Sequence, residues 1–123
     1  MERKSVIEHV VIGVADLEAS RAFYERALDA LGLRVIVDRP GYVGFGEQMP
    51  FFFLAAREPS AHVHVAFSAE RPELCDAFHA AAVAAGGTDN GAPGPRPAYH
   101  ERYYGAFVMD PDGNNIEAAC HAV

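Results

Sequence analysis

The stretch that decides the fold is residues 9–32, HVVIGVADLEASRAFYERALDALG, because the chain repeats it 55 positions later as residues 64–87, HVAFSAERPELCDAFHAAAVAAGG. Eight of the 24 aligned positions are identical, and His9 aligns with His64 while Gly32 aligns with Gly87. A repeat of this kind indicates a fold built from two similar units. Each copy opens with an apolar, strand-like segment that carries a histidine and continues into a helical pattern.

The two halves predict similar secondary structure. In the first half, Asp16 is suited to cap a helix that stops at Gly32, and the surrounding apolar runs predict strands over residues 6–14, 33–37, 41–46 and 51–55. In the second half, Pro72 suits the first turn of a helix that runs to about residue 85. Residues 88–102 are rich in glycine and proline and predict a long loop. Strands are expected over residues 62–67, 103–109 and 115–120.

Length and composition bound the class of protein. The chain has 123 residues, which is the size of one domain, and a formal net charge of −7. Its ten basic residues are scattered along the chain, which argues against nucleic-acid binding, since that needs a clustered basic face. No window approaches the ~20 apolar residues of a membrane span, and the N-terminus does not resemble a signal peptide. We therefore expect a cytoplasmic protein without a membrane or nucleic-acid partner.

Three strand-borne polar residues, His9, His64 and Glu117, stand among apolar neighbours and are expected to point inward. Two imidazoles and one carboxylate suit a divalent ion such as Zn, Fe, Mn or Ni, and they leave coordination positions open for a substrate. The repeat makes His9 and His64 equivalent, so they could face each other across one cavity. The alternative is that both are hydrogen-bonded core histidines and that Glu117 is solvated.

Other residues form a second group of candidates. Tyr99, His100 and Tyr103 lie just before the last hairpin with Arg102 and Tyr104, where a tyrosine–histidine pair could transfer protons; the alternative is a packed lid. His62 could replace His64 as a ligand if the strand register shifts. We expect His79 and His121 at the surface. Four aromatic residues could line a pocket or fill the core, namely Tyr42, Phe45, Phe51 and Phe53.

Three segments resemble the vicinal oxygen chelate superfamily of glyoxalases, bleomycin-resistance proteins and ring-cleaving dioxygenases. They are IEHVVIGVADLEASRAFYERALDALGLRV (7–35), HVAFSA (64–69) and FVMDPDGNNIEA (107–118), of which the last is the most specific. The resemblance covers nearly the whole chain and implies an α+β fold. It implies a single domain over residues 1–123, with βαβββ modules at about 5–56 and 61–121 paired as a curved mixed sheet around a cavity. It also implies that His9, His64 and Glu117 are metal ligands.

The resemblance implies a small metal-dependent enzyme that polarises an oxygen-bearing small substrate. It leaves lyase, isomerase, transferase and dioxygenase chemistry open. Enzymes like glyoxalase I have a further glutamate ligand on the last strand of the first module, where this chain has Phe51 to Leu54, so that isomerisation is not expected. The alternative is a metal-free, drug-sequestering protein of the bleomycin-resistance type, which the acidic charge suits. Edge strands that need covering predict a homodimer, in which the two histidines of one site can come from different chains.

Overall fold

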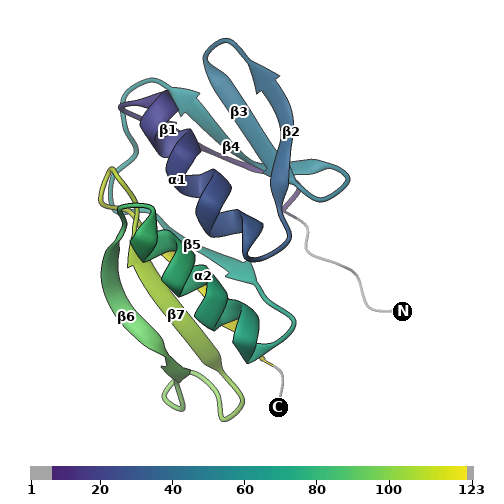
Figure 1. Cartoon of the computed structure of the whole chain (residues 1–123), viewed down its shortest axis with the longest axis vertical. Helices are drawn as coiled ribbons and strands as arrows, with labels where there is room; N and C mark the ends of the chain where they lie inside the picture. The colour runs from purple at the N-terminus through teal and green to yellow at the C-terminus, as the bar shows by residue number, and fades with distance from the viewer. Residues whose placement is uncertain (1–6, 122–123) are drawn as a thin grey trace.

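The computed structural model describes residues 7–121, and Figure 1 shows two similar halves, one above the other. Among the described residues, the first half, here called the first module, has one helix and four strands. In chain order these are β1 (Val10–Val14), α1 (Leu17–Asp29), β2 (Arg34–Arg39), β3 (Tyr42–Gly46) and β4 (Pro50–Ala56). The predicted strand over residues 6–14 begins with a residue that lies outside the described range.

The second module repeats this order from the middle of the chain onward. Its elements are β5 (His64–Ser68), α2 (Pro72–Ala84), β6 (Thr88–Pro95), β7 (Tyr104–Met109) and β8 (Asn115–Cys120). The first sheet has the strand order β1-β4-β3-β2 and the second has β5-β8-β7-β6, so the topologies match strand for strand. In both sheets the first strand pairs parallel with the last. The α+β fold with two βαβββ modules is therefore confirmed, as two four-stranded sheets that do not close on each other.

Local chemistry explains where α1 begins and ends. The Asp16 side chain accepts a hydrogen bond from the Ala19 N–H at 3.1 Å, which satisfies one of the free donors of the first turn. After the helix, Gly32 adopts a φ of +81°, a left-handed conformation that favours glycine. Between these points Phe23, Tyr24, Ala27 and Leu28 are buried, which gives the helix one face for the core.

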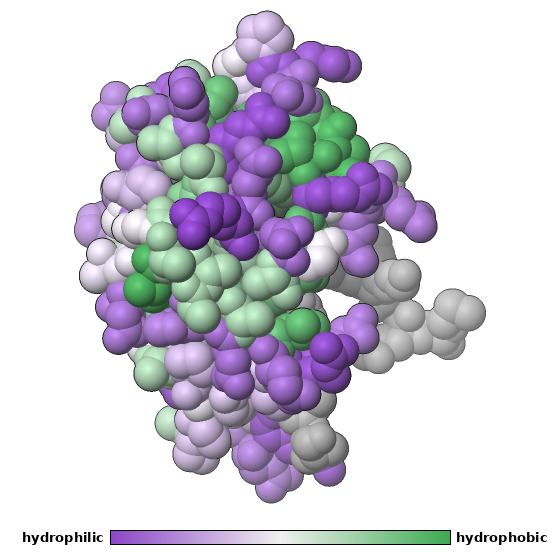
Figure 2. All heavy atoms as spheres, viewed as in Figure 1, coloured by the Kyte–Doolittle hydropathy of each residue, from purple (hydrophilic) through white to green (hydrophobic). Residues whose placement is uncertain are grey.

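The two helices lie next to each other on one side of the molecule and contact each other directly (Figure 1). Each helix covers one face of its own sheet, and one continuous hydrophobic core joins the two modules. Seen from the helix side, hydrophilic residues surround weakly apolar residues in the middle, and a strongly hydrophobic area lies at the upper right (Figure 2). The face of each sheet opposite its helix, called here the open face, is not covered by a helix. Within residues 7–121, neither helix has the length and apolarity needed to cross a membrane.

The loop predicted over residues 88–102 is wrong in its first half, because Thr88–Pro95 is the strand β6. This strand lies at the edge of the second sheet and pairs antiparallel with β7. Its prolines and glycines are tolerated because an edge strand needs ladder hydrogen bonds on one side only. The pairing accommodates them with register shifts between Asp89 and Gly91 and between Gly91 and Gly94.

Candidate functional site

Glu117 and His64 come together on the open face of the second sheet. Ala66 of β5 lies opposite Glu117 of β8, which places His64 two residues along the same face. The His64 Nε2 lies 2.7 Å from the Glu117 Oε1. Glu117 is only 1% exposed, whereas half of the His64 side chain, 52%, is exposed to solvent. The pair therefore presents a solvent-accessible imidazole above a buried carboxylate.

The second carboxylate oxygen of Glu117 is held by Tyr103, which donates its hydroxyl to Oε2. Burial, followed by this hydrogen bond and by the charge of Glu117, raises the pKa of the Tyr103 hydroxyl, so it remains a donor at neutral pH. Gly105 leaves room for this contact, since a Cβ there would lie 3.1 Å from Oε2 and 3.2 Å from the Tyr103 ring. The sequence did not single out Gly105. Its signal is its position two residues after Tyr103, where strand alternation puts both residues on the same face.

The turn over residues 110–114 sets the position of β8 and therefore of Glu117. The Asp110 Oδ1 accepts the backbone N–H groups of Asp112 and Asn114, while its Oδ2 accepts the Tyr24 hydroxyl at 2.6 Å. The Asn114 amide accepts from the Val63 N–H at 3.0 Å and thereby ties the turn to the residue before His64. The most specific motif of the sequence is thus a set of hydrogen bonds that aligns the two strands of the site.

The loop before β7 places its aromatic residues beside Glu117 and His121. The Tyr103 ring centroid lies 5.1 Å from that of Tyr99 and 4.9 Å from that of His121. The His100 ring lies 5.8 Å from His121, and its Nδ1 accepts the Arg102 N–H. Of the three predicted proton-transfer residues, Tyr103 touches Glu117 directly, whereas Tyr99 and His100 lie one ring further out. His121 is at the surface, as predicted, and it contacts this cluster.

His9 lies on the other sheet, immediately before β1. Its Nδ1 contacts the Glu8 carboxylate, and its ring packs edge-on against Phe53 with the centroids 5.5 Å apart. Half of its side chain, 50%, is exposed. Within residues 7–121 of one chain, no three His, Cys, Asp or Glu side chains meet where they could hold a metal. The structure therefore joins His64 with Glu117 and keeps His9 apart from them.

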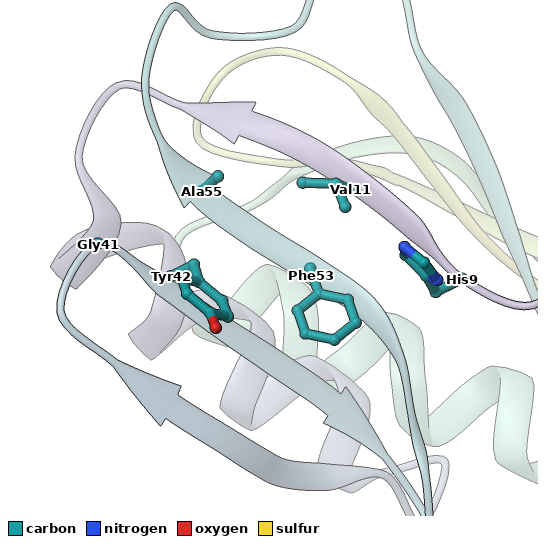
Figure 3. A pocket seen from close by; sticks show the side chains of 6 residues that line it. All are labelled: His9, Val11, Gly41, Tyr42, Phe53 and Ala55. Carbon is teal, nitrogen blue, oxygen red and sulfur yellow. The ribbon is translucent and has the colours of Figure 1, made fainter.

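A shallow pocket occupies the open face of the first sheet next to His9 (Figure 3). Its volume is about 350 Å³, and its lining consists of His9, Val11, Gly41, Tyr42, Phe53 and Ala55. Of the four aromatic residues with a predicted pocket or core position, two line this pocket. Phe45 instead lies in the core, and Phe51 is exposed outside the pocket.

The positions of two other histidines differ from those predicted from the sequence. His62 lies outside β5, with a φ of +58°, so it does not share a strand face with His64. His79 was expected at the surface, but its side chain is only 16% exposed and its Nε2 lies 2.8 Å from the Asp89 Oδ1. The unexpected strand β6 brings Asp89 next to α2, which explains this contact.

The two modules place different residues at equivalent positions. Val11 pairs with Phe53 in the first sheet, and its repeat counterpart Ala66 pairs with Glu117 in the second. Phe53 therefore occupies the position in the first module that is equivalent to that of Glu117 in the second. The first module offers one imidazole beside an apolar ring, whereas the second offers an imidazole and a carboxylate.

The chemistry of His64 and Glu117 fits two ligands of a divalent ion. Burying a carboxylate is costly unless it is paired, and within the described residues the only ion-pair partner of Glu117 is His64. A cation beside Oε1 would compensate this charge. One more ligand is needed for the predicted site, and His9 of the same chain does not reach it.

Two paired βαβββ modules with a histidine at the start of each define a known class of α+β proteins. The model of the Glyoxalase/Bleomycin resistance protein/Dioxygenase superfamily matches residues 6–118, and the chain belongs to this family.

Solved structures agree with this assignment. A glyoxalase/bleomycin resistance protein from Albidiferax ferrireducens T118 is 36% identical, with a TM-score of 0.85 over 94% of this chain and 99% of that one. A lactoylglutathione lyase from Agrobacterium tumefaciens is 22% identical, with a TM-score of 0.68 over 95% of this chain and 94% of that one, and supports the fold alone. No curated protein matches the sequence.

Proposed function

We propose that this protein is a small metal-dependent enzyme in which His64 and Glu117 hold a divalent ion together with His9. The observation that carries the proposal is the 2.7 Å approach of the His64 Nε2 to the Oε1 of a carboxylate that is 1% exposed. Zn, Fe, Mn and Ni are all compatible with two imidazoles and one carboxylate. The homodimer and the cytoplasmic location expected from the sequence are part of this proposal.

The side chains around the pair have distinct tasks. When bound, the ion supplies Lewis-acid polarisation of a substrate oxygen. Glu117 provides the anionic ligand through Oε1, and the Tyr103 hydroxyl orients it by holding Oε2. His100 accepts the Arg102 N–H at Nδ1, so its neutral imidazole carries the ring proton on Nε2. His100 and Tyr99 are the groups that exchange protons with the substrate from the loop side.

The third ligand comes from a second copy of the chain. His9 and its pocket lie on the open face of the first sheet, and His64 with Glu117 lies on the open face of the second. A homodimer that sets the first module of one chain against the second module of the other would bring the three donors together. Two equivalent sites would then form, each completed by both chains.

Metal titration of protein without a histidine tag tests this proposal. We expect one ion per chain in the wild type, and a loss of affinity of at least about 100-fold in Glu117→Gln, which keeps the shape but removes the negative charge. His64→Ala and His9→Ala are expected to lose binding as well. Glu73→Gln, on the exposed side of α2, is the matched control and should bind like the wild type. Equal metal content in all variants would falsify the site.

The apolar pocket favours a second candidate function, a metal-free protein that binds a small molecule. Phe53 replaces a carboxylate at the position equivalent to Glu117, and the pocket beside it is lined mainly by apolar side chains. In that case, the histidines would serve as polar lining. Wild-type protein that binds no divalent ion but retains a small-molecule ligand would favour this candidate.

A further inference from the structure

We propose that the pocket on the first module binds a flat, uncharged ring of the substrate, whose oxygen donor points toward His9. The position of the ring is inferred from the pocket alone, whereas the direction of the oxygen donor rests on the proposed metal site. The substrate class is accordingly an aromatic or otherwise planar apolar compound with an oxygen donor at one end.

The lining of the pocket carries the first part of the inference. Tyr42, Phe53, Val11 and Ala55 present apolar groups, and His9 is the one residue with ring nitrogens. No Asp, Glu, Lys or Arg belongs to the lining. A ligand group with a full charge would lose part of its hydration against these apolar side chains without an ionic partner in the lining, since Glu8, whose carboxylate contacts His9, lies outside it. An uncharged group avoids this cost.

The arrangement of the aromatic rings indicates the shape of the ligand. Phe53 lies between His9 and Tyr42, and Gly41 marks the far end of the pocket (Figure 3). The Phe53 and Tyr42 ring centroids are 6.2 Å apart and tilted by 45°, which leaves both rings available for contact with a third. Tyr42 is 41% exposed and Val11 is 40% exposed, so this apolar surface is accessible in the single chain.

Gly44 of β3 explains why the Phe53 ring lies low on the sheet. These two residues are paired across β3 and β4, and a Cβ at Gly44 would lie 2.5 Å from the Phe53 ring. The ring can therefore rest on the glycine and form the floor of the pocket. The volume of about 350 Å³ is near the lower end of the range for small-molecule sites and suits one or two fused rings.

The direction of the ligand follows from the position of His9 at one end of the pocket. If His9 binds the ion, a substrate oxygen at the metal and a ring against Phe53 and Tyr42 can belong to one short molecule. The opposite direction would place the oxygen near Gly41, away from the proposed ligands.

Two probes test the inference separately from the metal site. We expect 2-naphthol to bind metal-free protein saturably at one site per chain, as followed by its fluorescence. Phe53→Ala and Tyr42→Ala should each weaken binding at least about tenfold, since each removes a ring from the pocket. Phe51→Ala is the matched control, because Phe51 lies on the same strand, is 37% exposed and does not line the pocket. Unchanged binding in the Phe53 and Tyr42 variants would overturn the inference.

The second probe is a pair of chelators on zinc-loaded protein. Benzohydroxamate should bind at least about tenfold more tightly than acetohydroxamate, and Phe53→Ala should remove this preference while Phe51→Ala keeps it. Zinc binding without naphthol binding or ring preference would overturn the inference and leave the metal site standing. Naphthol binding without zinc binding would support the pocket and overturn the metal site. If Phe53→Ala changes only the oligomeric state, a second copy occupies the pocket and the inference is wrong.

Discussion

The two modules have apolar residues at equivalent positions on the sheet faces that pack against the helices. On the open faces, the equivalent residues differ in chemistry. Phe52 and Ile116 occupy equivalent positions toward the helices, and they are 1% and 0% exposed. One residue further along each strand, on the open face, the equivalent residues are Phe53 and Glu117. Side chains that pack under a helix must be apolar in both modules, whereas side chains on the open face are not restricted in this way. A duplicated fold can therefore specialise one face of each sheet without changing its core.

The specialised faces are complementary in chemistry. In the first module, an aromatic ring rests on Gly44 and forms an apolar floor. In the second module, the residue paired with Glu117 in the same way is Phe107, and Gly105 makes room for the contact between Glu117 and Tyr103. The first face suits the body of a ligand, and the second suits a cation and a polar oxygen. The proposed metal site, here called the composite site, would use both faces, with His9 from one chain and His64 and Glu117 from the other.

The largest expected effect tests whether the buried faces are equivalent. Phe52→Ala should lower the free energy of unfolding by about 3–5 kcal/mol, and Ile116→Ala by about 2–5 kcal/mol, because each leaves a cavity in the shared core. Phe53→Ala, one residue away but on the open face, should cost less than about 1.5 kcal/mol. Denaturant unfolding measures all three. A cost for Phe53→Ala equal to that for Phe52→Ala would contradict the assignment of faces.

The next effect tests a buried hydrogen bond between the two modules. Tyr24 of α1 is fully buried and donates to Asp110 in the turn that aligns β8. Tyr24→Phe leaves a carboxylate oxygen without this donor and should cost about 1–3 kcal/mol. Tyr104→Phe removes a similar bond to Asp76 at the exposed surface and should cost less than about 1 kcal/mol. We expect the unfolding midpoint of Tyr24→Phe to lie below that of Tyr104→Phe. The reverse order would contradict a stabilising role for the buried hydrogen bond between Tyr24 and Asp110.

A third experiment introduces the chemistry of the second module into the first. Phe53→Glu places a carboxylate beside His9, at the position equivalent to Glu117. If the proposed composite site exists, this adds a ligand, and metal affinity should rise about tenfold or more, which is about 1.4 kcal/mol. Calorimetric titration measures the change, with Val83→Glu, at an exposed position of α2, as the control. If both variants bind metal like the wild type, Phe53 does not face the site.

The smallest effect concerns a contact inside the second module. The backbone N–H of Gly91 and, second, the His79 side chain lower the pKa of Asp89. A carboxylate whose pKa is lower in the folded state stabilises the protein above its unfolded pKa of about 3.9 and loses this contribution as the pH falls through the folded value. Asp89→Asn should therefore be slightly less stable than the wild type near pH 6. The difference should shrink below about pH 4; a gap that widens toward acid would contradict the sign.

The repeat and the two helices that end at glycines predicted β-α-β-β-β for the first half but one strand fewer for the second, and the βαβββ order of both modules was implied by the family resemblance. Periodicity predicted the strands well wherever an apolar face is buried, as in β4 and β8. It failed at Thr88–Pro95, because an edge strand with several glycines and prolines has no alternating pattern, and only pairing with β7 defines it. Pairing of this kind depends on hydrogen bonds to another strand, and the residues of β6 alone do not reveal it.

The candidate site could be predicted only in part from the sequence. His64 and Glu117 lie within one module, and strand alternation places them on the same face once β5 pairs with β8. The contact of Tyr103 with Glu117 depends on how the loop after β6 returns to the sheet, which the sequence leaves open. The separation of His9 from Glu117 depends on how the two modules pack, and the repeat pattern is compatible with a site inside one chain or between two.

The central claim is that each metal site is completed by two chains, and a mixed dimer of His9→Ala and His64→Ala chains tests it most directly. In the composite arrangement, one site of this heterodimer loses both histidines, while the other keeps His9 from one chain and His64 with Glu117 from the other. Neither homodimer should bind metal with wild-type affinity. The isolated heterodimer should bind one ion per dimer with wild-type affinity. A heterodimer that binds no better than the two variant homodimers would contradict the claim.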